Sequence, residues 1–277
     1  SLSRLTSDGA QLNVNLLGEA VLGGDHASRR LEATTRLLAR DDIADIMVAL
    51  KAESLVVGRD SLSKAPSLAH AKNIGMFRNL SAEPIVALKP SVVLGSHMAH
   101  PASIYGQLNR HKIKAVNVIP TQSEQSFAKG IVEVGKYAGK SSQAGALSQT
   151  WLRQMQARSK TGKRYVFTYD GQIVAGKNTV ADTLIRLAGG VNAAANIDGM
   201  KPIARETWAT LKPDVVVIAQ HSLPMVGGSV AAFKQRPEMA ASAAARNNKV
   251  VSMTAGEAFS LDLNSPKVVD KLHALAR

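Results

Sequence analysis

Short apolar runs alternate along this chain with segments whose apolar residues recur at helical spacing. The run 215–219 has the length of a buried strand, whereas Ile43, Ile46, Met47 and Leu50 fall on one face of a helix. Strand and helix signals continue to alternate to the C-terminus. This alternation is typical of an α/β protein with mostly parallel sheets.

One pattern occurs twice in the same frame, at residues 83–94 (EPIVALKPSVVL) and 206–217 (ETWATLKPDVVV). In each copy an acidic residue opens a short helix, a Lys-Pro corner ends it, and a β-branched run begins a strand. The chain is therefore predicted to form two related, Rossmann-like lobes with a ligand cleft between them. We expect an irregular leader over 1–32, an N-terminal lobe over 33–140, a long helix over 141–160 between the lobes, and a C-terminal lobe over 161–277.

The composition narrows the class of protein. The chain has 277 residues, 45% hydrophobic, and a formal net charge of +13, and it contains no cysteine that could form a disulfide or a thiolate site. The basic residues are spread along the chain and aromatic residues make up only 4%, so nucleic-acid binding is disfavoured. We therefore favour the interpretation that the positive surface attracts an anionic ligand. The N-terminus shows no signal peptide, as expected of a mature, processed chain.

Polar residues that follow the strands are the candidate ligands, because parallel sheets bind ligands at the carboxyl ends of their strands. His97, His100 and His221 are possible metal ligands, and the repeat places one histidine beyond an equivalent strand in each half. A His-x-x-His pair in a loop is a weak signal, however, and the favoured interpretation is that they are loop histidines that bind nothing. Tyr169 ends a strand, and a phenolate is a strong donor to ferric iron.

Arginine side chains supply a second type of candidate. Arg59 and Arg78 could bind carboxylates through paired hydrogen bonds, or could be solvated surface charges. The sequence shows no glycine-rich nucleotide loop, no nucleophile elbow and no convincing acid–base pair, so nothing in it favours catalysis.

Several segments together resemble the periplasmic haem-binding proteins of bacterial haem-uptake ABC transporters. The segments are 57–61 (VGRDS), 74–83 (IGMFRNLSAE), 88–90 (LKP), 175–182 (AGKNTVAD) and 187–190 (LAGG). The similarity runs from about residue 33 to the C-terminus. The LKP frame is shared with cobalamin and siderophore binding proteins of the same class III substrate-binding protein superfamily, whereas the first and fourth segments point more narrowly to haem.

The resemblance implies a carrier that binds haem in the cleft between two lobes joined by one long helix, and that works in the periplasm. It also implies that Glu83 and Glu206 dock onto arginines of an ABC permease dimer. The chain would then contact the inner membrane only through the permease. The alternative for the two glutamates is a simple role in the first turn of a helix, where a carboxylate is favourable.

The sequence departs from this family at the iron-binding position. Met76 stands where haem-binding members typically have a tyrosine, while Phe77 beside it cannot ligate iron and the partner Arg78 is retained. Some members use a histidine after the first strand of the second lobe, and Tyr169 stands at that position. One interpretation is that Tyr169 ligates the iron, with Met76 as a weak partner. The other is that a different ligand is bound and Arg78 holds its carboxylate.

These observations leave several functions open. A haem carrier is favoured, and a ferric siderophore or cobalamin carrier is the alternative. A divalent-metal carrier that uses the three histidines is a less well supported function. A two-lobed tetrapyrrole metal chelatase is the remote enzymatic alternative, and we expect no enzyme activity.

Overall fold

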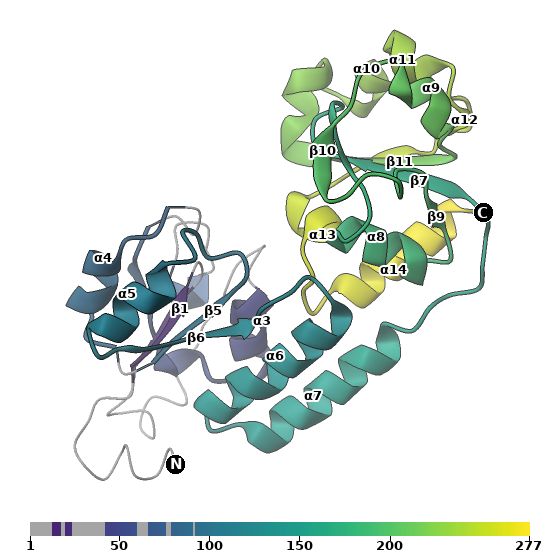
Figure 1. Cartoon of the computed structure of the whole chain (residues 1–277). Helices are drawn as coiled ribbons and strands as arrows, with labels where there is room; N and C mark the ends of the chain where they lie inside the picture. The colour runs from purple at the N-terminus through teal and green to yellow at the C-terminus, as the bar shows by residue number, and fades with distance from the viewer. Residues whose placement is uncertain (1–12, 18–19, 24–41, 60–65, 76–78, 91) are drawn as a thin grey trace. The chain divides into compact units, whose positions relative to one another are not determined.

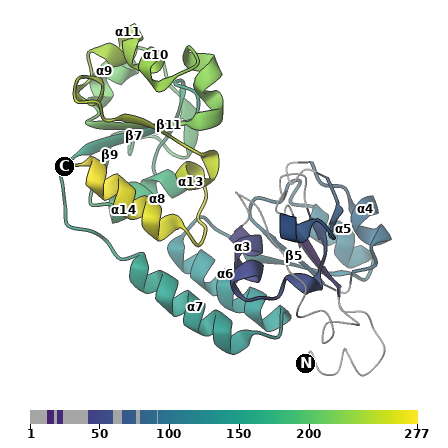
Figure 2. The same cartoon turned by 180° about the vertical axis from the view of Figure 1, so that it is seen from behind.

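The computed structural model of the chain divides into two compact units (Figures 1 and 2). Unit 1 comprises Ser1–Thr121 and Gln125–Leu152, and unit 2 comprises Gln122–Glu124 and Arg153–Arg277. The structure describes residues 13–17, 20–23, 42–59, 66–75, 79–90 and 92–277. Each unit is an α/β structure with its own sheet, which confirms the predicted fold class.

Unit 1 contains a six-stranded sheet in the order β4-β3-β2-β1-β5-β6. The pairs β1–β5, β5–β6 and β3–β4 are parallel, while β1–β2 and β2–β3 are antiparallel, so the sheet is mixed. The strands are β1 (Asn13–Leu17), β2 (Ala20–Gly23), β3 (Val56–Arg59), β4 (Lys72–Asn73), β5 (Val92–Ser96) and β6 (Lys114–Ile119).

Two of these strands correct the prediction of an irregular segment over residues 1–32. β1 and β2 form an antiparallel hairpin in which Val14 pairs with Leu22, and β1 also pairs with β5, where Leu16 lies opposite Leu94. The hairpin therefore lies inside the sheet. Residues 24–41, which include the predicted start of the N-terminal lobe at residue 33, lie outside the described residues.

The helices of unit 1 cover its sheet and extend beyond it. Ile85 and Leu108 pack with Val93 in one apolar cluster, which places α4 and α5 against the sheet. Farther along the chain, the ring centroids of Phe127 and Trp151 lie 4.7 Å apart, so α6 and α7 pack on each other. The helical segments are α3 (Asp42–Ala49), η1 (Glu53–Leu55), η2 (Pro66–Leu68), α4 (Ala82–Ala87), α5 (Ile104–Arg110), α6 (Glu124–Tyr137) and α7 (Ser141–Gln154).

The long helix predicted over 141–160 is shorter than expected. α7 ends at Gln154, and residues 156–163 form no helix or strand before β7 begins at Arg164. Other contacts replace the helical bonds here: the Arg158 backbone N–H donates to the Leu187 carbonyl (2.7 Å), and the Thr161 N–H donates to the Gly189 carbonyl (2.8 Å). This segment is therefore held by other residues of unit 2, to which it belongs.

Unit 2 contains a sheet in the order β10-β8-β7-β11-β12, with β9 also paired to β7. The central pairs β7–β11 and β11–β12 are parallel, and β8 and β10 extend the sheet antiparallel. The strands are β7 (Arg164–Thr168), β8 (Ile173–Ala175), β9 (Val191–Asn192), β10 (Met200–Pro202), β11 (Val215–Ala219) and β12 (Val250–Met253).

Helices cover both faces of this sheet. Successive side chains of a strand point to opposite sides, so each strand offers side chains to the helices on both faces. Val216 and Ile218 pack with Trp208 and Phe233 in one cluster, on the side of α9 to α12. Figures 1 and 2 show α8, α13 and α14 on the other side. The helical segments are α8 (Val180–Leu187), α9 (Thr207–Leu211), η3 (Gln220–Val226), α10 (Val230–Gln235), α11 (Pro237–Ala240), α12 (Ala243–Arg246), α13 (Ala255–Phe259) and α14 (Ser265–Leu275).

The sequence repeat has the same backbone path in both units. α4 is followed by Lys89 with a φ of 49°, and β5 begins three residues later at Val92; α9 is followed by Lys212 with a φ of 44°, and β11 begins at Val215. A left-handed residue after a helix ends it and turns the chain, which is why the strand follows so soon. The helix, Lys-Pro corner and strand predicted for each copy are therefore confirmed.

Candidate functional site

Three aromatic side chains gather at the carboxyl ends of the parallel strands of unit 2. Tyr169 directly follows β7, His221 lies in η3 after β11, and Phe259 ends α13, which follows β12. The ring centroids of Tyr169 and His221 are 4.8 Å apart in an edge-on arrangement, and those of Tyr169 and Phe259 are 5.9 Å apart. The three strands are neighbours in the sheet, so their ends bring together residues that lie far apart in the sequence.

A tight turn fixes the position of Tyr169. Its backbone N–H donates to the Ile173 carbonyl (2.8 Å), and the Asp170 carboxylate accepts from the N–H groups of Gln172 (2.9 Å) and Ile173 (2.8 Å). Gly171 completes the turn with a φ of 85°, a conformation that favours glycine. Because the turn is bonded at each residue, Tyr169 projects from a rigid support.

This aromatic cluster offers two kinds of chemistry in one place. Tyr169 and Phe259 are half-buried and His221 is exposed, so the rings present faces and edges to a ligand rather than being sealed in the core. Aromatic rings favour flat, conjugated ligands, and a tyrosine phenolate is a donor to ferric iron. The cluster can therefore hold a planar ligand and contribute one iron-ligating oxygen.

The histidines of unit 1 follow the end of β5. His97 is half-buried, and its Nδ1 lies 3.2 Å from the Ile119 carbonyl oxygen, a contact in which Nδ1–H is the donor. That tautomer leaves Nε2 as an acceptor for a ligand or metal. His100 is exposed, and the structure shows no contact between the side chains of His97 and His100 within the described residues.

The expectation of a histidine metal site gains no support from this geometry. Among the residues that the structure describes, no group of three or more histidine, cysteine or acidic side chains could hold a metal ion. Within the same ranges, no helix has the length and hydropathy needed to cross a membrane. A metal site that combines these histidines stays a prediction, because His97 and His100 belong to unit 1 and His221 belongs to unit 2.

Of the other predicted ligand-binding residues, Arg59 is the last residue of β3 and lies within the described ranges. Arg59 is half-buried and its Nε donates to the Leu68 carbonyl at 3.1 Å, so part of this guanidinium has a structural role. Met76, Phe77 and Arg78 lie outside the described residues. Each unit is described by itself, so the cleft expected between the lobes stays a prediction.

The two glutamates of the repeat occupy equivalent, accessible positions. Glu83 lies in the first turn of α4 and Glu206 is the N-cap residue of α9, and both are exposed. Neither carboxylate has an ion pair or a hydrogen bond in the described part of the chain. Both charges are therefore available to a partner.

Two aromatic residues that lie in helices, Phe259 and Tyr105, are not marked as site residues by the sequence. Phe259 lies far along the sequence from Tyr169, and the two come together only because β11 pairs with β12. In unit 1, Tyr105 donates from its hydroxyl to the carbonyl of Ser96, the last residue of β5 (2.9 Å). No local pattern marks either residue, because each belongs to a helix and not to the end of a strand.

Known proteins with solved structures share this architecture. The periplasmic haem-binding protein BhuT, solved with two haems, is 30% identical in sequence, with a TM-score of 0.76 over 85% of this chain and 94% of its own. HutB, a periplasmic haem-binding protein of Vibrio cholerae, is 25% identical, with a TM-score of 0.74 over 88% of this chain and 99% of its own.

A curated relative points to the cobalamin branch of the same fold. The vitamin B12-binding protein of Yersinia pestis (strain Pestoides F) is 25% identical over 218 residues, which cover 76% of this chain and 75% of the relative. Residues 39–256 match the periplasmic binding protein family as a whole. That match takes in both copies of the repeat together with Tyr169 and His221, and the chain belongs to the periplasmic binding protein family.

Proposed function

We propose that this chain is a periplasmic carrier that binds haem and delivers it to an ABC permease, with the Tyr169 phenolate as the iron ligand. The observation that carries the proposal is the cluster of Tyr169, His221 and Phe259 at the carboxyl ends of the strands. A fixed phenol flanked by rings suits a flat ferric porphyrin. The 30% identity to a haem-binding protein supports the same cargo.

The remaining predicted residues have supporting roles in this proposal. Arg59 and Arg78 would pair with the haem propionates, and the net charge of +13 would attract those carboxylates from solution. Met76 and Phe77 would pack on the porphyrin, and His97 and His100 are further candidates for contact. No chemical conversion of the cargo is involved, which distinguishes the carrier from the chelatase alternative.

Glu83 and Glu206 would dock the carrier on the permease dimer. Both carboxylates are exposed and lack partners in the described ranges, and the repeat relates them to each other. A pair of exposed carboxylates on two related units suits a two-fold symmetric partner that presents basic residues. The chain would act in the periplasm and contact the inner membrane through the permease alone.

A hemin titration tests the ligand assignment. The wild-type chain and a Tyr169→Phe variant are titrated while the Soret and charge-transfer bands are recorded. Tyr137→Phe is the matched control, because Tyr137 is half-buried in α6 and does not belong to the aromatic cluster. We expect saturable binding with a tyrosinate-type band in the wild type and the control, and loss of that band in Tyr169→Phe.

The other outcomes are equally informative. Saturable binding with an unchanged spectrum in Tyr169→Phe would keep haem as the cargo and reject Tyr169 as the ligand, and His221→Ala would be the next variant to titrate. Absence of saturable hemin binding by the wild type would overturn the haem proposal.

A cobalamin or siderophore carrier is the second candidate, favoured by the similarity to the vitamin B12-binding protein. Its test is calorimetric titration with cyanocobalamin and with a ferric siderophore under the same conditions as hemin. Tighter binding of either compound than of hemin would replace haem as the cargo.

A further inference from the structure

One stretch of the chain in unit 1 carries basic residues and no acidic ones. Residues 84–123 contain no aspartate or glutamate, although the chain has 21 acidic residues in all. Within this stretch, basic side chains gather around the connection between α5 and β6. We call this group the basic turn, and its members are Arg110, His111, Lys112 and Lys114.

The backbone of the basic turn is held in a fixed conformation. Lys112 has a φ of 60°, which turns the chain from the helix into the strand. The N–H of the next residue, Ile113, donates to the Leu108 carbonyl (3.1 Å), and its side chain is only 7% exposed. Because Ile113 is anchored in the core, Lys112 and Lys114 on either side of it remain exposed at defined positions.

Stabilisation of the helix end accounts for only part of this charge. A cation in the last turn of a helix is favoured by the partial negative charge of that end, which suits Arg110 in α5. Lys112 lies beyond the C-cap residue, and Lys114 is the first residue of β6. The helix therefore does not explain the two lysines.

No acidic side chain neutralises the basic turn. Within the described ranges, none of its members forms an ion pair. The ring of Tyr137, the last residue of α6, contacts Lys114, whose Nζ lies 5.0 Å from the ring centroid. On the same helix, Glu133 is already paired with Lys136. The turn thus presents uncompensated positive charge beside an aromatic ring.

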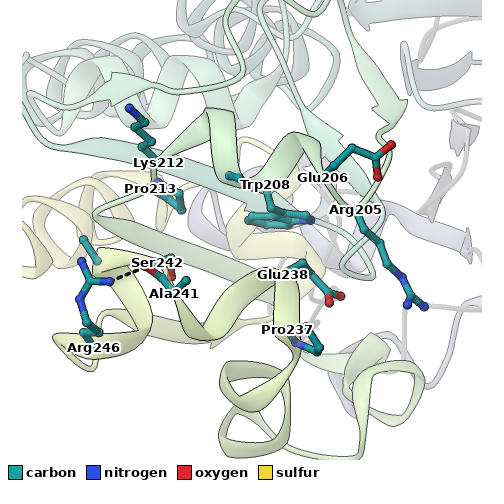
Figure 3. Close-up of a pocket in the computed structure, with 12 residues that line it drawn as sticks. Arg205, Glu206, Trp208, Lys212, Pro213, Pro237, Glu238, Ala241, Ser242 and Arg246 are labelled. Carbon is teal, nitrogen blue, oxygen red and sulfur yellow. Dashed lines mark hydrogen bonds between the residues drawn. The ribbon is translucent and has the colours of Figure 1, made fainter.

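The recess beside α9 in unit 2 is the opposite case (Figure 3). Its lining carries both signs of charge, with the side chains of Arg205, Glu206, Lys212, Glu238 and Arg246. An anionic surface would meet repulsion as well as attraction there. Positive charge of a single sign therefore distinguishes the basic turn from this recess.

We infer that the basic turn binds the phosphate headgroups of an anionic phospholipid bilayer. A bilayer surface is an extended array of phosphates, and each lysine or arginine held near it adds to the attraction. Tyr137 supplies a ring with an apolar body and a polar hydroxyl, the kind of side chain that favours the membrane–water interface. The turn and the ring together form one contact surface.

The contact with lipid goes beyond the proposed function, in which Glu83 docks on the permease. Glu83 opens α4, and the other end of α4 leads through the Lys-Pro corner to the amino end of β5. The basic turn lies at the amino end of β6, which is parallel to β5. The two features lie toward opposite edges of one sheet. A carrier docked through Glu83 would therefore leave the turn free for the other membrane that bounds the periplasm, the outer membrane.

Co-sedimentation with vesicles tests the inference. The vesicles contain either phosphatidylglycerol mixed with phosphatidylethanolamine, or phosphatidylcholine alone, and the wild type is compared with Lys112→Glu/Lys114→Glu. The matched control is Lys201→Glu/Lys212→Glu, because Lys212 is an exposed lysine with a φ of 44° after a short helix and Lys201 is exposed in a strand. Both double variants lower the formal net charge of +13 by the same amount, so only the location of the change differs.

We expect the wild type to bind the phosphatidylglycerol vesicles at low salt and not to bind phosphatidylcholine. Lys112→Glu/Lys114→Glu should weaken binding by about tenfold or more, while the control stays within about threefold of wild type. Lys112→Gln/Lys114→Gln, which adds no repulsion, should fall between wild type and the glutamate variant. All these differences should shrink as the salt concentration rises.

Two results would overturn the inference. Equal weakening in the two glutamate double variants would assign vesicle binding to overall charge and not to the basic turn. Failure of the wild type to bind phosphatidylglycerol vesicles at low salt would reject the contact with lipid outright.

A hemin titration of each variant separates this inference from the proposed cargo. Unchanged hemin affinity together with weakened vesicle binding in Lys112→Glu/Lys114→Glu is the expected result, and it also shows that the variant is folded. Vesicle binding by a wild-type chain that binds no hemin would keep the contact with lipid and reject haem. Hemin binding without vesicle binding would keep the carrier and reject the basic turn as a contact surface.

Discussion

The indole Nε1–H of Trp208 donates a hydrogen bond to the carbonyl oxygen of Gly171 at 3.1 Å. Gly171 lies in the turn that positions Tyr169, and Trp208 lies in α9, the helix that Glu206 opens. One buried bond therefore links the candidate docking helix to the candidate ligand turn. Trp208 also packs edge-on against Phe233, with ring centroids 6.3 Å apart, so its indole is held from two sides.

Replacement of Trp208 by Phe tests this link. Phenylalanine keeps an aromatic ring in the core but removes the N–H, which leaves the buried Gly171 carbonyl without this donor. We expect the free energy of unfolding to fall by about 1–3 kcal/mol, measured by urea denaturation. We also expect weaker hemin binding, because the turn that carries Tyr169 loses a hydrogen bond that holds it in place. Weaker stability with wild-type hemin affinity would show that the bond serves the fold alone.

Gly171 itself should not tolerate a side chain. A Cβ at this position would lie 3.2 Å from side-chain atoms of both Phe233 and Val226, and the residue has a φ of 85°. Alanine would therefore meet backbone strain of about 1–2 kcal/mol and a crowded contact as well. We expect Gly171→Ala to lower the free energy of unfolding by more than strain alone.

Gly162 supplies the matched control for that prediction. It has a φ of 67°, but a Cβ there would meet nothing within 4 Å. Gly162→Ala should therefore report the backbone strain without the crowding. Equal losses of stability in the two alanine variants, measured by urea denaturation, would show that Phe233 and Val226 move aside at little cost.

The helix–Lys–Pro–strand repeat could be predicted because its signals are local. An acidic residue in the first turn, a Lys-Pro corner and a β-branched run each act on a few neighbouring residues, and the structure has them at Glu83 to Leu94 and at Glu206 to Val217. The same locality explains the correct positions of Tyr169 and His221 after β7 and β11. A strand end is visible in the sequence where an apolar run stops.

The hairpin β1–β2 and the place of Phe259 could not be predicted in this way. β1 is stabilised by pairing with β5, a strand far along the chain, and no hydrophobic pattern within residues 1–32 indicates that pairing. Phe259 reaches Tyr169 only because β12 lies beside β11 and α13 follows it. The end of α7 at Gln154 is a similar case, since the bonds from Arg158 and Thr161 to Leu187 and Gly189, far along the chain, replace helical ones.

Tyr165 should make the stability of the chain sensitive to alkaline pH. Burial, and then the charge of Asp214, raise the pKa of Tyr165 to about 12, against 10.0 for an exposed tyrosine. Below pH 10 the folded and unfolded states both keep the proton, so the favourable contribution of the buried phenol is complete. Between pH 10 and 12 the unfolded chain ionises and the native chain does not, so stability falls as the pH rises.

A Tyr165→Phe variant isolates this effect. At pH 8 the wild type should be more stable by about 1 kcal/mol, because the Tyr165 hydroxyl donates to the Leu272 carbonyl at 2.7 Å. The shift of the pKa from 10.0 to about 12 corresponds to about 2–3 kcal/mol lost across that interval. The phenylalanine variant should therefore become the more stable chain before pH 12, in urea denaturation at pH 8, 10, 11 and 12. Tyr137→Phe controls for general alkaline effects, and parallel pH profiles of wild type and Tyr165→Phe would contradict the raised pKa.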